Sequence, residues 1–309
     1  MKQTLRANLL LLLTATIWGA AFVAQVVAAD SVAPLAFNAS RMLLASLALC
    51  PVICWMDRRS LRHPGQGQTL PFSHMSHEQR RSLLTGSLLC GLMLTLGSSF
   101  QQLGIDAGAS AGKAGFITAM YIVLVPLLGL FRKQRVTPLI FLAVCISLIG
   151  LYLLCITEQL TIEMSDLYLM LCALCFSLHI LAVDHFSRRT DCVKLSCLQF
   201  LVVAMLCGVA SALTETVVWS DLVACAVPIL YAGVLSGAVG YTLQIVAQKD
   251  TNPTVASLIM CLESVFAAIF GWLILGDLLT VRETLGCCAM FCAIVLAQLP
   301  VGQTKGMDA

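Results

Sequence analysis

The sequence predicts an all-α membrane protein with ten transmembrane helices arranged as two inverted five-helix repeats. Three observations lead to this fold class: the composition, the number of long apolar stretches, and a repeat that relates the two halves of the chain. Hydrophobic residues make up 59% of the 309 residues and charged residues only 11%, whereas a soluble domain carries about 25% charged residues. A water-soluble globule of this composition would expose far too much apolar surface, so most of the chain is expected to lie in lipid.

The composition also excludes several classes of partner. A net charge of +2 without a basic stripe excludes a nucleic-acid binder. The fifteen cysteines are scattered through apolar stretches, where thiols behave as small hydrophobes. No cofactor and no metal site are expected. The expected partners are a lipid bilayer and a small-molecule substrate, and a homodimer is left open.

Ten apolar stretches are long enough to cross a bilayer, because a hydrocarbon core of roughly 30 Å needs about 20 helical residues. Turn residues such as Asn252-Pro253 separate most of them, and the short connections predict that consecutive helices are antiparallel neighbours. The one long hydrophilic loop is expected at about 56–81. The stretches lie at about 9–29, 33–55, 82–103, 108–131, 138–157, 165–186, 193–214, 222–247, 253–275 and 283–300.

Basic residues predict the orientation. With a cytoplasmic N-terminus, fifteen of the eighteen Lys and Arg residues fall in cytoplasmic segments, and only Arg282 falls in an outside loop. The remaining two, Arg41 and Lys113, lie within spans. By the positive-inside rule this pattern favours an even number of spans with both termini in the cytoplasm. The expected location is the plasma membrane, which in bacteria is the inner membrane.

The two halves of the chain repeat one another, so residues 1–157 and 158–309 are predicted to be two five-span units. Matching residues are 158 positions apart early in each half and 142–144 apart later. The number drops at the 56–81 loop, because the counterpart of this loop at 215–221 is short. Because five is an odd number, the second unit enters the membrane upside down. Such inverted repeats are typical of secondary transporters, whose substrate site lies between the repeats near the midplane. Matches at offsets of 158 and then 142–144 include Trp18 with Phe176, Arg41 with Gln199, and Tyr121 with Glu263.

The same residues resemble a known family. Ala15-x-x-Trp18-Gly19-x-x-Phe22-Val23, Arg41, residues 110–118 and Val125-Pro126 resemble the first EamA repeat of the drug/metabolite transporter superfamily. Leu262-Glu263-Ser264-Val265, Leu275-Gly276-Asp277 and Thr280 resemble the second repeat. Ser264 stands where the family usually has proline, which bears on the bend of the ninth span, and Asp277 stands where it usually has glutamate. The resemblance covers about residues 9–299. It implies ten helices in two inverted bundles and the transport of small metabolites, often amino acids.

Ionisable residues within the spans are the first candidates for a substrate site, because each costs roughly 2.5 kcal/mol or more to insert. Arg41 offers a planar fork suited to a carboxylate or a phosphate. Glu263 could hold an amine or carry a proton, and His179 could also carry a proton. Lys113 is a second cation, although it could reach the interface. Polar and aromatic residues extend the predicted substrate-binding set with Trp18, Tyr121, Gln101, Tyr241 and Gln244.

A purely structural role is the alternative for these residues. Arg41 could pair with Glu263, or with backbone carbonyls, and only lock helices together. Intramembrane amides most often hold helices together in the same way, and His179 could be a hydrogen-bonded packing residue. Under these alternatives the residues would stabilise the folded protein and would not bind a substrate.

The leading hypothesis is a secondary active transporter, not an enzyme. It would move a small metabolite, best matched by an amino acid or similar zwitterion, out of the cell by alternating access. A lipid-acting membrane enzyme or scramblase is an alternative that would need charges concentrated at one interface beside a catalytic pair. A passive channel would need rings of like residues in an oligomer. The sequence shows only scattered charges within its spans.

Overall fold

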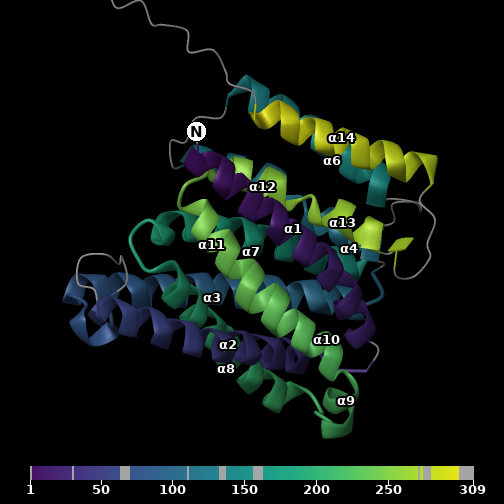
Figure 1. Cartoon of the computed structure of the whole chain (residues 1–309). Coiled ribbons are helices and arrows are strands. Elements are labelled where there is room, and N and C mark those ends of the chain that lie inside the picture. Colours follow the sequence, from purple (N-terminus) through teal and green to yellow (C-terminus); the bar gives the residue numbers. More distant parts are fainter. Residues whose placement is uncertain are drawn as a thin grey trace, which may run out of the picture.

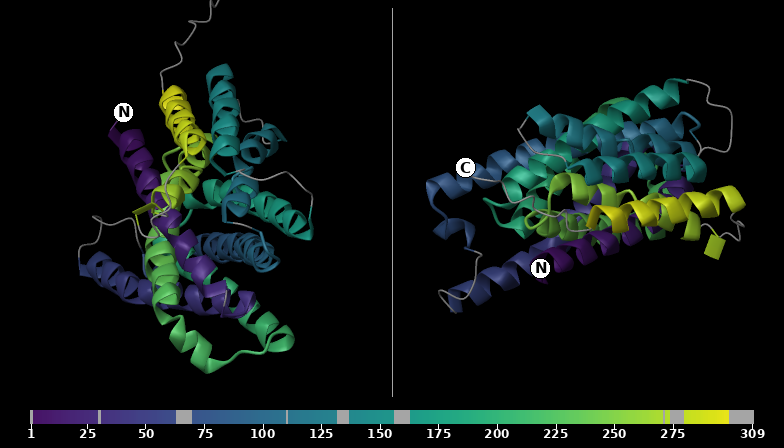
Figure 2. Two further views of the ribbon diagram at one scale, coloured as in Figure 1. Left: turned by 90° about the vertical axis from the view of Figure 1, so that its right-hand side faces the viewer. Right: turned by 90° about the horizontal axis from the view of Figure 1, so that it is seen from above.

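A computed structural model describes residues 2–29, 31–62, 70–109, 111–131, 137–155, 163–270, 272–273 and 280–298. These residues form helices, turns and short connections, and no strand occurs among them. The long helices lie side by side in one bundle and run roughly along one direction (Figures 1 and 2). Seven helices in the described ranges are long and apolar enough to cross a membrane. The chain is therefore a multi-pass helical membrane protein.

Each of the ten predicted stretches contains helix. The first half has α1 (Lys2–Ala29), α2 (Pro34–Arg62), η1 (Phe72–His74), α3 (His77–Asp106), α4 (Ala111–Thr118), α5 (Tyr121–Phe131) and α6 (Pro138–Cys155). The second half has α7 (Met164–Ser187), α8 (Cys192–Thr214), α9 (Trp219–Ala224), α10 (Ala226–Leu230), η2 (Tyr231–Tyr241), α11 (Thr242–Gln248), α12 (Pro253–Met260), α13 (Glu263–Phe270) and α14 (Val281–Gln298). The segment η2 is a π-helix, and with α10 and α11 it forms one continuous stretch.

Side chains in the connections cap the N-termini of several of these helices. The Asn252 side-chain oxygen accepts the Thr254 backbone N–H at 2.9 Å, and Pro253 occupies the first helical position. Proline is well placed there because the first helical N–H has no partner within the helix.

The hydrophilic loop is shorter than the predicted 56–81. Helix α2 continues through Arg62 and α3 already begins at His77. Ser76 and Gln79 cap the start of α3 reciprocally: the Gln79 backbone N–H donates to the Ser76 hydroxyl at 3.2 Å, and the Ser76 N–H donates to the Gln79 side chain at 2.9 Å. A helix satisfies its own backbone hydrogen bonds in lipid and in water alike. The length of an apolar stretch therefore underestimates the length of the helix that contains it.

The most extensive helix contacts join the two halves of the chain. Helix α3 packs on α7, α2 on α8 and α6 on α14, while α1 packs on η2, α11, α12 and α13. Figure 1 shows α6 with α14 along one edge of the bundle and α2 with α8 along the opposite edge. The prediction that consecutive helices are neighbours holds only in part: α2 contacts α3 and α3 contacts α4, but α2 and α3 contact the second half of the chain far more extensively. Short connections set the direction of a helix but not which of its faces is packed.

Glycines set the closest of these approaches, and they occur at matching places in the two halves. A Cβ added to Gly91 of α3 would lie 3.0 Å from the Gln199 carbonyl of α8, and one added to Gly233 of η2 would lie 2.7 Å from the Arg41 carbonyl of α2. Gly91 and Gly233 are 142 positions apart, and Arg41 and Gln199 are 158 apart. We call residues related by these offsets repeat mates. The α3–α8 and η2–α2 crossings are thus built from repeat mates.

Candidate functional site

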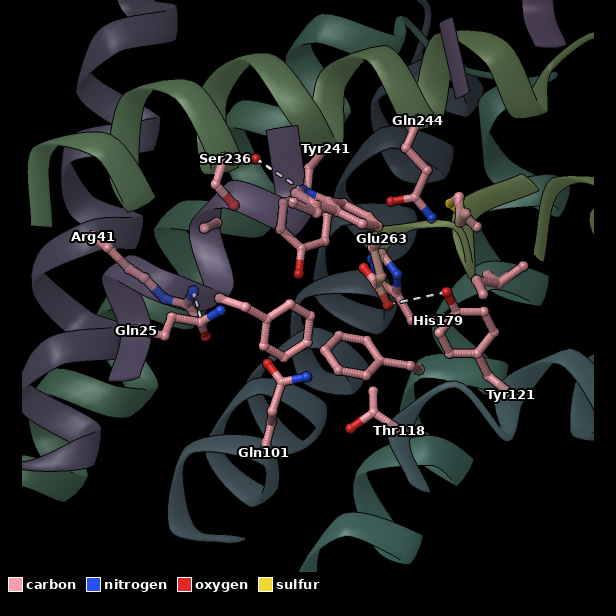
Figure 3. A pocket seen from close by; sticks show the side chains of 16 residues that line it. Gln25, Arg41, Gln101, Thr118, Tyr121, His179, Ser236, Tyr241, Gln244 and Glu263 are labelled. Atoms are coloured by element: carbon pink, nitrogen blue, oxygen red, sulfur yellow. Dashed lines mark hydrogen bonds between the residues drawn. The ribbon is translucent and has the colours of Figure 1, made fainter. Parts of the chain in front are cut away.

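A buried cavity lies where helices of the two halves meet. Figure 3 shows its side chains converging from both halves of the chain. The lining residues are Trp18, Ala21, Phe22, Gln25, Arg41, Gln101, Thr118, Tyr121, Phe176, His179, Ile180, Ser236, Tyr241, Gln244, Met260 and Glu263.

Eight of the nine predicted site residues line this one cavity, although they come from eight helical elements, of which only η2 and α11 are continuous. The ninth, Lys113, lies in α4, and its side chain lies outside the described residues. The cavity also contains polar residues that the sequence did not single out, namely Gln25, Thr118 and Ser236. Spacing could have indicated Gln25, because it follows Trp18 by seven residues and so lies on the same helix face.

Arg41 occupies one end of the cavity. Its Nε donates to the Asn38 side-chain oxygen at 2.9 Å and its Nη1 to the Gln25 side-chain oxygen at 3.3 Å. The guanidinium carbon lies 5.2 Å from the centre of the Phe37 ring. Among the described residues no carboxylate forms an ion pair with Arg41. An Arg41–Glu263 ion pair, which one alternative for Arg41 requires, is therefore not what the structure shows.

Glu263 lies toward the other end, beside Tyr121, which donates a hydrogen bond from its hydroxyl to the Glu263 carboxylate at 3.2 Å. Each of the two residues begins a helix, α5 and α13, directly after a break in its span. Tyr121 and Glu263 are repeat mates, 142 positions apart. The helix is interrupted before Glu263 even though Ser264 replaces the proline that is usual at this position in the family that the sequence resembles. The start of a helix carries partial positive charge, which favours a carboxylate there.

Aromatic rings form the wall between the two ends. The ring centres of Trp18 and Tyr241 are 4.6 Å apart, and the Trp18 indole N–H donates to the Ser236 carbonyl at 3.3 Å. His179 lies edge-on to Tyr241 at 6.1 Å and shares a hydrogen bond of 3.1 Å with Gln199. These contacts fix the rings and leave the Tyr241 hydroxyl pointing into the cavity (Figure 3).

Two glutamines supply further polar groups. The Gln244 side-chain nitrogen donates to Gln248 at 3.0 Å, while its buried oxygen has no partner among the described residues. The Gln101 amide also points into the cavity and forms no hydrogen bond with another described side chain or backbone group. Polar groups without protein partners are expected where a ligand or water completes them.

Many of the lining residues are repeat mates, so the cavity lies where the two halves face each other. The charges at its two ends arise where mates differ, at Arg41 against Gln199 and at Tyr121 against Glu263. The lining pairs are Trp18 and Phe176, Ala21 and His179, Phe22 and Ile180 at an offset of 158, Thr118 and Met260, Tyr121 and Glu263 at 142, and Gln101 and Gln244 at 143.

Comparison with known proteins identifies the family. The family model described as the EamA-like transporter family matches residues 5–156 and 163–299. The chain belongs to the EamA-like transporter family. This membership confirms the resemblance of the sequence motifs and makes the chain a membrane transporter, a class distinct from enzymes.

Relatives of this EamA-like transporter carry the same general description. An uncharacterized transporter of Archaeoglobus fulgidus is 27% identical over 307 residues, which cover 97% of this chain and 88% of that protein. The uncharacterized transporter YoaV of Bacillus subtilis is 25% identical over 298 residues, 94% of this chain and 95% of that protein. A solved crystal structure shares the fold with a TM-score of 0.75 and 14% identity, over 94% of this chain and 96% of the other.

Proposed function

We propose that the chain is a secondary active transporter that moves a small zwitterion, such as an amino acid, out of the cell by alternating access. The observation that carries the proposal is a cavity between the halves with a carboxylate at one end and, at the other, a guanidinium that forms no ion pair with a described carboxylate. The expected setting is the plasma membrane with both termini in the cytoplasm.

Matched features in the two halves support an inverted repeat. The breaks at residues 119–120 and 261–262 are separated by the offset of 142 that relates the two halves there. Interrupted helices at corresponding positions of two repeats point to a substrate site, because such breaks free backbone groups and helix ends. The proposed motion is a rocking of residues 1–157 against 158–309 around this cavity.

The separation of the two charges favours a small substrate. A Cβ on Gly19 would lie 2.8 Å from the Glu263 carbonyl, while Gln25, six residues later on α1, binds Arg41. Six helical residues correspond to roughly 9 Å along the axis. The two residues are thus anchored less than two helical turns apart along α1. This spacing favours a small substrate that can reach both of them.

Glu263 is also the proposed site of proton coupling, with His179 as a second candidate. The described partners of the two side chains, Tyr121 and Gln199, are uncharged hydrogen-bonding groups. A carboxylate held by a neutral hydroxyl can accept either a proton or the amine of a substrate. Exchange of one for the other at Glu263 would couple the two movements.

Variants of Arg41 test the proposal. Arg41→Lys keeps the charge but loses the two-pronged hydrogen bonding, so it should weaken transport while the protein remains folded. Arg41→Gln should abolish transport. Uptake or efflux of amino acids in proteoliposomes, measured together with thermal unfolding in detergent, gives both quantities.

The double variant Arg41→Gln with Glu263→Gln is the control for a purely structural role. If Arg41 served only to neutralise Glu263, removing both charges would restore folding and transport together. Under the proposal the double variant folds but remains inactive. An active double variant would show that Arg41 belongs to the scaffold and that the zwitterion proposal is wrong.

A further inference from the structure

Asn38 lies one helical turn before Arg41 on α2, is fully buried, and does not line the cavity. We propose that Asn38 is a positioning residue, which holds the Arg41 guanidinium with its terminal nitrogens toward the cavity and leaves the positive charge free for the anionic group of the substrate. This inference rests on the proposed function, because it deepens the role of Arg41 in the same site.

Hydrogen bonds on both sides fix the orientation of the Asn38 amide. Its nitrogen donates to the Ser98 carbonyl of α3 at 3.1 Å, and its oxygen accepts the Arg41 Nε–H at 2.9 Å. A flipped amide would place donor against donor at Arg41 and acceptor against acceptor at Ser98. The backbone of α3 therefore determines which Asn38 atom faces the guanidinium.

The fixed Nε in turn determines how the guanidinium can be approached. Of the five N–H donors of an arginine, one binds Asn38 and one binds Gln25, which leaves three on the terminal nitrogens. The Phe37 ring lies against the guanidinium and restrains its rotation. Figure 3 shows the guanidinium beside Gln25 at the edge of the cavity. An anion entering the cavity therefore meets the terminal nitrogens end-on.

The chemistry of the two partners matters as much as their geometry. Asn38 and Gln25 are neutral amides, so they orient the guanidinium without cancelling its charge. A carboxylate at either position would form an ion pair and compete with the substrate. A buried charge without a counter-ion is costly, and a substrate anion removes this cost when it binds. Neutral partners thus make the anion-bound state more favourable relative to the empty one.

The test compares Asn38→Ala and Asn38→Asp with the control Ser196→Ala. Ser196 is the repeat mate of Asn38, 158 positions later, and is equally buried on α8. Its hydroxyl donates to the Cys192 carbonyl of the same helix. The probes are L-leucine and L-leucinamide, which differ in the carboxylate alone. We expect wild type to bind leucine more tightly. Both Asn38 variants should reduce this preference about tenfold or more, the effect of one hydrogen bond to a charged group, and Ser196→Ala should keep it.

A second measurement decides the role of Asn38 without any substrate. The ¹⁵N resonance of the Arg41 Nε–H, identified by its absence in Arg41→Lys, should be protected from solvent exchange in wild type and in Ser196→Ala. Asn38→Ala should lose this protection. Asn38→Asp preserves the size of the side chain, so it provides the binding comparison if Asn38→Ala fails to fold.

The outcomes separate this inference from the proposed function. Unchanged protection and unchanged preference in the Asn38 variants would overturn the positioning role. Lost protection with an unchanged preference would overturn the claim that the orientation serves an anion. Wild-type protein that binds neither probe would contradict the substrate proposed above, whereas the resonance of Arg41 would still decide the role of Asn38.

Discussion

Gly233 illustrates how one residue sets the distance between two helices. A Cβ there would lie 2.7 Å from the Arg41 carbonyl, closer than van der Waals contact allows, and a Cβ on its repeat mate Gly91 would lie 2.7 Å from Val202 Cβ. Both glycines therefore allow a helix to approach a neighbour at the level of the cavity. Small residues at such crossings are how helices pack closely in membranes.

Alanine substitutions test this role. Gly233→Ala and Gly91→Ala should each lower the free energy of unfolding by about 1–3 kcal/mol, the usual effect of overpacking. Gly208→Ala is the matched control, because its Cβ would lie at an ordinary 3.9 Å from Ala39. This change should be neutral or stabilising by up to about 1 kcal/mol, since alanine favours a helix. Thermal unfolding in detergent measures all three, and equal effects at the three positions would contradict the packing role.

The sequence indicated both charged residues that line the cavity but only some of its neutral polar residues. Arg41 and Glu263 were identified because a charge in lipid is expensive and therefore rare. Thr118 and Ser236 were missed because neutral polar residues are common in transmembrane helices, and only the packing of the bundle selects those that face the cavity. Asn38 was missed for a further reason: it acts on Arg41 and does not reach the cavity.

At the level of elements, α2 and α8 are fastened together at both ends. At one end the Lys194 ammonium of α8 binds the Asp57 carboxylate of α2 at 2.7 Å and also the Leu70 carbonyl. At the other end the Glu215 carboxylate after α8 accepts the backbone N–H groups of residues 35 and 36, each at 2.9 Å. Asp57 and Glu215 are repeat mates, 158 positions apart. In each case a carboxylate near the end of one helix reaches the start of the other.

Glu215 should stabilise α2 as a helix cap does. Glu215→Ala leaves two N–H groups at the start of α2 without acceptors and should cost about 1–2 kcal/mol of unfolding free energy. Glu215→Gln retains one acceptor but no charge, so its effect should be smaller. Thermal unfolding of the two variants provides the measurement. A loss from Glu215→Gln as large as that from Glu215→Ala would indicate that charge alone matters, and no loss from either would exclude a cap.

Helix positions followed from the sequence more reliably than helix interruptions. Apolar length determines where a span must lie, so each predicted stretch contains helix. Residues 259–264, around the break before Glu263, contain no proline or glycine, so the local sequence does not predict the break. It does not predict the π-helix at Tyr231–Tyr241 either, although π-helical turns are frequent at functional sites. Both segments pack against the other half of the chain: η2 contacts α1 and α2, and α13 contacts α1.

Across the whole molecule, the repeat mates of the sequence contribute to the helix crossings and to the cavity in different ways. Repeat mates build the crossings and most of the cavity wall, whereas the charges at its two ends occur where mates differ. The α6–α14 crossing is equally close: a Cβ on Gly150 would lie 2.9 Å from the Gly286 carbonyl, and one on Gly286 would lie 2.7 Å from the Gly150 carbonyl. Under the proposed alternating-access mechanism, the two halves would rock between two similar states, and the site, whose charges differ at its two ends, would bind the substrate in one orientation.

The inverted arrangement and the orientation can be tested together, because corresponding connections of inverted repeats lie on opposite sides of the membrane. Ser73 and Thr216 are exposed residues in the corresponding connections after α2 and α8. The basic residues predict that Ser73 faces the cytoplasm, so Thr216 should face outward. In intact cells a membrane-impermeant maleimide should label Thr216→Cys above the wild-type background of natural cysteines, and it should label Ser73→Cys only after the cells are opened.

Labelling of Ser73→Cys alone in intact cells would reverse the orientation while preserving the inversion. Labelling of both, or of neither, in intact cells would place the two connections on one side, as parallel repeats require, and would remove the basis for alternating access between inverted halves.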